Sequence, residues 1–142
     1  MAFLHGKKAL FKIDNSGGTL VDISAYCESV DLSRDIDTAE TSTFGSTAKT
    51  YVVGLIDGKI SVNGKFDAAG ASTVDAVLSG TLGQDASLTF EYQASNAAAS
   101  STNPKYTGEC YITSYKVSSP VNDVVSFSAE FQITGAVTRA TV

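Results

Sequence analysis

The side chains that could carry out chemistry are few in this sequence, and their spacing does not form a site. His5 is the single histidine, and it lies in a segment that we interpret as an N-terminal arm. A Ser–His–Asp site would have to use this histidine, and a zinc site needs further His or Cys ligands at close spacing. Asp35, Asp37 and Glu40 are close together, but a calcium loop also needs a glycine at its sixth position and a closing glutamate. We therefore predict no catalytic residue, no metal ligand and no cofactor.

Three tyrosines in one strand-like segment could form a platform for a sugar ring. Strand periodicity places Tyr111 and Tyr115 on one face and Tyr106 on the other. A platform needs its aromatic rings on one surface, so we favour a role for these side chains in the core or between subunits.

The composition favours a single weakly charged domain. The chain has 142 residues, of which 18% are charged, and its formal net charge is -5. This charge argues against binding to nucleic-acid phosphates, which requires clustered Lys and Arg. No run approaches the roughly 18 apolar residues of a membrane span, so we expect no membrane partner. We interpret Cys27 and Cys110 as reduced thiols, because a disulfide would require their strands to be neighbours.

Period-two alternation of apolar and polar residues predicts a mainly β fold. The clearest example runs from Val125 to Thr134, where every second side chain is apolar. Turn signals such as Asn15-Ser16-Gly17-Gly18 and Ile56-Asp57-Gly58 separate the segments. The fold class that these patterns predict is an antiparallel β-sandwich or barrel. The eight predicted strands are 9–14, 19–23, 26–34, 50–55, 59–67, 86–93, 105–118 and 121–136.

One short flanking α-helix is predicted over residues 72–79. Ser72 is a suitable N-cap, Asp75 occupies the third helical position, and Gly80 is placed to end the helix. A helix of about two turns is not stable alone, so this one must pack on the sheet. Its apolar stripe consists of Val74, Val77 and Leu78.

Between two strand-like segments lies a polar stretch that is longer than most connections. Residues 37–50 are rich in Thr and Ser and contain one large apolar side chain, Phe44. Loops of this length within a domain are commonly functional or disordered. A lone aromatic residue followed by Gly45 suggests an anchor for something outside the domain.

The order of these segments resembles the tail tube (major tail) proteins of bacteriophages with long, flexible tails. An alternating strand is followed by Thr-Ser-Thr-Phe-Gly at 41–45, by Lys-Thr-Tyr-Val-Val-Gly-Leu at 49–55, and by a strand that ends in Asn-Gly-Lys-Phe-Asp at 63–67. The segments Tyr-Thr-Gly-Glu-Cys-Tyr-Ile-Thr-Ser-Tyr at 106–115 and Phe-Ser-Ala-Glu-Phe-Gln-Ile-Thr-Gly at 127–135 fit the same pattern. The resemblance covers roughly residues 5–138 and depends on order and spacing.

This resemblance implies a structural subunit that forms hexameric rings stacked into a tube, with the whole chain, 1–142, as one tail-tube domain. The polar stretch, taken as residues 34–50, would be the inter-ring stacking loop. An N-terminal arm (1–8) with Phe3 and Leu4, and a C-terminal tail (136–142), would add contacts. The stacking-loop residues expected to contact the next ring are Asp37, Thr41, Thr43, Phe44 and Lys49.

A tube of this kind would conduct DNA through a water-filled lumen. The candidates for lumen-facing side chains are Glu91, Glu130 and Gln132. Acidic walls would keep phosphates from adhering, so DNA and the tape-measure protein would pass without specific binding. The expected partners are further copies of the chain and the tail tip and tail terminator proteins, and the expected location is the virion tail, assembled in the host cytoplasm.

Two other functions remain open at this point. One is the inner tube of a contractile tail or of a related secretion system, which has the same strand pattern. The other is a monomeric β-sandwich binding module, which would keep its sheet edges sealed. The sequence does not distinguish a flexible from a contractile tail, and it does not show which charges face the lumen.

Overall fold

The computed structural model describes residues 3–142 as a curved seven-stranded antiparallel sheet with one helix. The strand order in the sheet is β2-β1-β5-β6-β7-β4-β3. The strands are β1 (Leu10–Asp14), β2 (Leu20–Asp22), β3 (Cys27–Glu40), β4 (Tyr51–Lys65), β5 (Leu88–Gln93), β6 (Lys105–Ser118) and β7 (Ser126–Ala140). The helical elements are η1 (Gly6–Lys8), η2 (Ser24–Tyr26) and α1 (Val74–Thr81).

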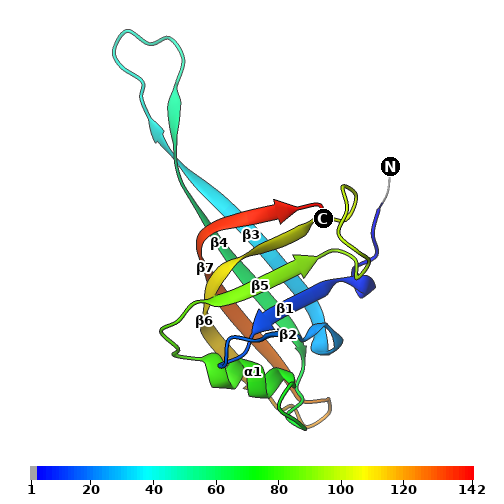
Figure 1. Ribbon diagram of the computed structural model, residues 1–142. Coiled ribbons are helices and arrows are strands. Elements are labelled where there is room, and N and C mark those ends of the chain that lie inside the picture. Colours follow the sequence, from blue (N-terminus) through cyan, green and yellow to red (C-terminus); the bar gives the residue numbers. More distant parts are fainter. Residues whose placement is uncertain (1–2) are drawn as a thin grey trace.

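The sheet folds back on itself, so that β1 and β5 cross in front of β3 and β4 (Figure 1). Strand β6 joins the two layers and has register shifts after Thr107 and after Ile112, and such bulges bend a strand. The ring of Phe11 in β1 lies 6.1 Å from that of Phe131 in β7, centroid to centroid. The core therefore fills the space between the two layers, as a sandwich or barrel requires.

The alternation in β7 predicted its buried face correctly. Phe127, Ala129, Phe131 and Ile133 are all buried, while Glu130, Gln132 and Thr134 are exposed. The remaining core side chains come from β1, β4, β5, β6, α1 and the residue before η2. They are Phe11, Ile13, Ile23, Ile60, Val62, Val74, Val77, Leu78, Leu88, Phe90, Cys110 and Ile112.

The helix forms two residues later than predicted, at Val74–Thr81 instead of 72–79. Its N-cap is Thr73, whose hydroxyl donates to the Gly70 carbonyl (2.8 Å) and so holds the preceding chain in a turn. Gly80 lies within the helix, and the left-handed residue beyond the helix is Gly83 (φ +84°). The predicted apolar stripe is confirmed, because Val74, Val77 and Leu78 are fully buried.

Two of the eight predicted strands are one strand in the structure. The Asp57-Gly58 pair was expected to turn the chain, but β4 runs straight through it and pairs with β3 at Asp35↔Asp57 and Arg34↔Gly58. The amide of Gln132 donates to Asp57 Oδ1 (2.7 Å), which gives this aspartate a partner within the sheet. A Cβ on Gly58 would lie 3.0 Å from the Ser33 carbonyl oxygen, so glycine serves close packing there.

The bounds predicted for the long loop, the C-terminal tail and the N-terminal arm also differ from the structure. Residues 34–40, expected to be loop, continue β3, and residues 136–140, expected to be tail, continue β7. Both segments lack clean apolar alternation. Residues 34–40 do not cover the core, and Val137 is the side chain of 136–140 that packs against it, so backbone pairing defines these segments as strands. Of the predicted N-terminal arm, 1–8, the structure describes residues 3–8, which include the short helix η1; residues 1–2 lie outside the described part.

Gly64 supports the tightest contact in the fold. A Cβ at this position would lie 1.9 Å from the Tyr26 carbonyl oxygen, where β4 passes η2. We predict that Gly64→Ala lowers the free energy of unfolding by about 3 kcal/mol or more, because backbone on both sides would have to move. Urea denaturation of dilute protein would measure this.

Gly6→Ala is the matched control for that variant, since a Cβ there meets nothing within 4 Å. Its unfolding free energy should stay within about 0.5 kcal/mol of the parent value. Equal stability of the two variants would mean that β4 and η2 do not approach this closely.

Candidate subunit interface

The most exposed part of the molecule is a two-stranded arm formed by the ends of β3 and β4 (Figure 1). The last pair between β4 and β7 is Lys59↔Gln132, and from there to its start at Tyr51, β4 pairs with β3 alone. Tyr51 lies eight residues before Lys59, so at about 3.3 Å per residue β4 extends roughly 26 Å beyond that last pair. We call residues 35–57 the arm.

The arm begins where β7 separates from β4. Gly135 has a φ of +79°, a backbone conformation that residues with a side chain rarely adopt. Beyond Gly135, β7 pairs with the first half of β6, as far as Lys105↔Ala140. The Gln132 amide donates to Asp57 Oδ1 (2.7 Å) and to the Gly58 carbonyl (3.0 Å). These bonds tie β7 to β4 at the last point before the strands diverge.

Apolar side chains project from both faces of the arm. Ile36 and Ile56 pair across one face, and the register shift beyond them puts Val53, opposite Thr38, on the same face. Val52, opposite Ala39, and Leu55 lie on the other face. Leu55 is 86% exposed and Ile56 is 69% exposed. An isolated two-stranded ribbon is marginally stable, and an apolar patch of this size on a soluble protein usually marks an interaction site. The exposed large apolar residues of the arm are Ile36, Phe44, Tyr51, Val52, Val53, Leu55 and Ile56.

The structure places all five residues predicted for the stacking loop on the arm. Asp37 lies in a register shift of β3, next to Gly54 of the partner strand. The other four, Thr41, Thr43, Phe44 and Lys49, belong to the 41–50 loop at the tip and are exposed. The hydroxyls of Thr41 and Thr50 lie 2.7 Å apart and close the base of this loop. Phe44 makes the tip apolar, since its side chain is fully exposed.

Sequence reasoning missed the apolar residues of β4 that lie on the arm. Residues 51–56 read Tyr-Val-Val-Gly-Leu-Ile, with no alternation of polar and apolar positions. Such a run is typical of a strand that is covered on both faces. The adjacent Asp-Gly pair led us to interpret it as one side of a tight hairpin instead.

Two long strand edges have no partner within the described chain. Strand β3 is the last strand of the sheet, and its outer edge is unpaired. Strand β5 pairs with β6 only as far as Leu88↔Cys110, so the outer edge of β6 is open from Tyr111 onwards. Open edges are templates for pairing with another chain. These edges lie on the two margins of the layer formed by β3, β4, β7 and the second half of β6.

The two predicted lumen-facing acids lie on opposite outer surfaces. Glu130 is on β7 opposite Ser61, whereas Glu91 is on β5 opposite Lys12 and Thr107. The core lies between these two layers, so side chains on their outer faces point away from each other. Glu91 also contacts Lys105, at 3.7 Å between charged atoms. Gln132, the third candidate, is on the same strand face as Glu130 and is engaged with Asp57.

The outer face of the β3-β4-β7-β6 layer is polar. Its exposed charges include Glu130, Lys116, Lys59 and Asp31, and Lys65 pairs with Glu28 at 2.9 Å. The other side chains around Glu130 are short and uncharged: Ser61, Asn63, Ser114 and Ser128. A sheet face of this composition suits contact with water rather than a protein core.

The tyrosines do not follow the predicted alternation. The register shift between Ile112 and Ser114 turns Tyr111 to the polar face opposite Gln132, and Tyr115 to the core face opposite Ala129. The Tyr115 hydroxyl donates to Asp75 Oδ1 (2.8 Å) in α1, which links the helix to β6. Burial is the larger of the causes that raise the pKa of Tyr115, and the hydrogen bond to Asp75 raises it further. The tyrosines therefore form no common platform.

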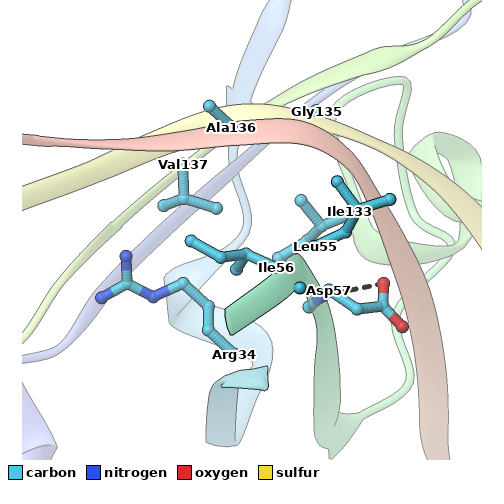
Figure 2. Close-up of a pocket in the computed structure, with 10 residues that line it drawn as sticks. Arg34, Leu55, Ile56, Asp57, Ile133, Gly135, Ala136 and Val137 are labelled. Carbon is cyan, nitrogen blue, oxygen red and sulfur yellow. Dashed lines mark hydrogen bonds between the residues drawn. The ribbon is translucent and has the colours of Figure 1, made fainter. Parts of the chain in front are cut away.

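A groove lies at the root of the arm, in the fork between β4 and β7 (Figure 2). Its volume is about 500 Å³. The side chains of Arg34 and Asp57 stand at its rim. The apolar side chains that line it are Leu55, Ile56, Ile133, Ala136 and Val137.

The predicted N-terminal contact residues are accessible, with Phe3 fully exposed and Leu4 half exposed. Cys27 and Cys110 are both free, as the sequence suggested. Burial, with smaller effects of nearby carboxylates, raises the pKa of each thiol to about 12. Neither thiol is therefore nucleophilic near neutral pH.

Among residues 3–142 no three His, Cys, Asp or Glu side chains gather as metal ligands. In the same part of the chain, no helix has the length and apolarity needed to cross a membrane.

Comparison with known proteins relates this fold to tail tubes. A model of the family described as phage tail tube protein matches residues 4–139. No curated protein matched the sequence.

Several solved structures share the fold at low sequence identity. A chain from the virion of a native gene transfer agent particle has a TM-score of 0.78 and 18% identity, over 97% of this chain and 99% of that one. The SPP1 tail tube has a TM-score of 0.77 and 12% identity, over 99% and 80%. A chain from the sheath-tube complex of an extracellular contractile injection system has a TM-score of 0.69 and 14% identity, over 99% and 93%.

The arm should contribute little to the stability of the isolated chain. Val53→Thr changes an exposed side chain of β4, so we expect an unfolding free energy within about 0.5 kcal/mol of the parent value. Val62→Thr makes the same change in the buried part of the same strand and should cost about 1–3 kcal/mol. Urea denaturation of monomeric protein compares the two. A large loss for Val53→Thr would show that the arm packs within its own chain.

Proposed function

Since this chain belongs to the phage tail tube protein family, we propose that it polymerises as hexameric rings stacked into a tail tube that conducts DNA. The observation that supports this proposal most strongly is the arm, which carries apolar side chains on both faces and has no layer of its own chain to cover them. A second copy of the chain can cover it. The role is structural, and we assign no catalytic group.

Ring closure would use the two open edges. The outer edge of β3 in one subunit would pair with the edge of β6 beyond Tyr111 in the next, continuing the sheet around the ring. A sheet that closes on itself leaves no edge exposed. In this arrangement the polar face of β4, β6 and β7 becomes the lumen wall, and the hydrophobic core lies on the other side of that layer, away from the bore.

The lumen wall would then contain Glu130 and Gln132 but not Glu91. Its short serine and asparagine side chains offer few groups that grip a phosphate, and its charges have both signs. DNA and a tape-measure protein would pass along it without specific contacts. Six copies carry a formal charge of about -30, but the Debye length of about 8 Å keeps its influence close to the wall.

Stacking would use the arm, with Phe44 at its tip and Asp37, Thr41, Thr43 and Lys49 around it. Phe3 and Leu4 would add contacts at the N-terminal end. The tube ends would meet tail tip and tail terminator proteins, and the tube would be part of the virion tail after assembly in the host cytoplasm.

An inner tube within a contractile sheath is the second candidate. The likeness to a chain of a sheath-tube complex favours it, because that fold also covers nearly the whole of this chain. The two candidates share the ring, the arm and the bore, and they differ in whether a sheath binds the outer surface.

We predict that Phe44→Ala weakens polymerisation and leaves the fold intact. Burial of a phenylalanine contributes about 1.5–3 kcal/mol, so the critical concentration for tube formation should rise at least about tenfold. Sedimentation and negative-stain images of concentrated protein measure the tubes, and circular dichroism measures the fold.

Asn96→Ala changes an exposed side chain in the loop between β5 and β6, outside the arm, and is the control. It should form tubes at the same critical concentration as the parent protein. If concentrated parent protein stays monomeric under all conditions, the proposed function is wrong. If Phe44→Ala instead unfolds the monomer, Phe44 belongs to the core and not to an interface.

A further inference from the structure

The groove at the arm root is lined by apolar side chains, and no segment of the described chain fills it. Ile133 and Val137 of β7 form one wall, and Leu55 and Ile56 of β4 form the other (Figure 2). A groove of about 500 Å³ is within the range that holds a drug-sized ligand, so it has room for several side chains of a turn. The identity of the occupant rests on the proposed function, because in a stacked tube the groove is filled by part of a second copy.

An exposed apolar turn lies at the end of the molecule opposite to the arm. The β6–β7 turn, residues 119–125, presents Val121 with 99% of its side chain exposed and Val124 with 59%. Its position is fixed by the pair Lys65↔Ser126 and by the Phe66 N–H, which donates to the Val125 carbonyl (3.0 Å). The turn therefore lies at the Lys65 end of β4, while the arm lies at the Tyr51 end (Figure 1).

Identical rings stacked in one orientation meet through two different surfaces. Such a contact is heterologous: the end that carries the arm meets the end that carries the turn. The groove is on the arm end, so the surface of the next ring that faces it is the turn end. We propose that the β6–β7 turn of a subunit in one ring docks in the arm-root groove of a subunit in the next ring, with Val121 as the inserted side chain.

Charges at the two surfaces agree with this pairing. Arg34 stands at the groove rim and forms no ion pair among residues 3–142. The turn carries Asp123 between the two valines, and its Oδ1 accepts the Val124 N–H (2.7 Å). In the docked arrangement Asp123 would face Arg34, whose guanidinium lies 5.4 Å from the centroid of the Tyr106 ring, while the Asp57 carboxylate at the same rim accepts a hydrogen bond from Gln132. The pair of opposite charges fixes the orientation of the contact more than its strength.

The Phe44 loop is a poorer occupant. It lies at the end of the arm, and the groove lies at the root of the same arm, so a loop from the same ring would have to bend back along its own ribbon. The arm of the ring on the other side points at the turn end of this subunit. In a stack with one orientation the turn end faces the groove, and Val121 of the β6–β7 turn is an apolar side chain there that is 99% exposed.

Cross-linking in assembled tubes tests the contact. The variant carries Val121→Cys together with Leu55→Cys, which places one thiol on the turn and one on the exposed groove wall. Mild oxidation of tubes should give a ladder of disulfide-linked chains on a non-reducing gel, because every subunit bears both groups. Cys27, which is half-buried, and Cys110, which is buried, should stay unreacted, because the pKa of each thiol is raised to about 12. Tubes formed under reducing conditions are first verified by negative stain.

The controls separate this inference from the proposed function. Each single variant should give no species beyond a dimer, and Val121→Cys with Asn96→Cys should give no ladder. Tubes without a ladder from the test pair would overturn the docking and leave the tube intact. A ladder from Phe44→Cys with Leu55→Cys would also overturn it, by identifying the arm tip as the occupant. Absence of tubes in the parent protein would instead overturn the proposed function.

A second variant covers the case in which the double cysteine protein does not assemble. Val121→Asp places a charge where the groove is apolar, and it should raise the critical concentration for tubes at least about tenfold. Ala98→Asp adds the same charge to an exposed loop and should not. Both should keep the parent's unfolding midpoint in urea. Equal assembly of the two variants would count against the docking.

Discussion

The separation of β7 from β4 is the constraint on which the rest of the structure depends. From Lys59 to Lys65, β4 has a strand on each side and a core beneath it, whereas from Tyr51 to Gly58 it pairs with β3 alone. The positive φ of Gly135 directs β7 away, and the Gln132 side chain holds the two strands together at the fork. One half of β4 therefore lies within the sheet that covers the core, and the other half projects from it with β3 as its single neighbour. The arm, the groove and the exposed apolar surface all arise at this point.

The two halves of β4 have different energetic roles. Ile60 and Val62 are fully buried and stabilise the monomer, whereas Leu55 and Ile56 remain in water until another chain covers them. The apolar side chains of the arm therefore lower the free energy only on assembly, when another chain buries them.

The sequence predicted those parts of the fold in which the core imposes a period. The face of β7 from Phe127 to Ile133 and the stripe of α1 were both correct, because burial selects every second or every third to fourth residue there. It failed where no core acts. Residues 34–40 have no alternation, Asp57-Gly58 resembles a turn in isolation, and a bulge near Ile112 changed the face of Tyr115. Phe44 was found because it is alone in a polar loop, whereas Leu55 was hidden in an apolar run.

The asymmetry of a single chain decides what kind of assembly it can form. The open edges of β3 and β6 lie on two margins of one curved layer, so pairing them repeats a rotation and can close into a ring. The arm and the β6–β7 turn lie at the two ends of β4, so joining them repeats a translation, which has no natural end. A closed contact fixes the width of a tube, and an open one leaves its length free. The length must then be set by something other than this chain.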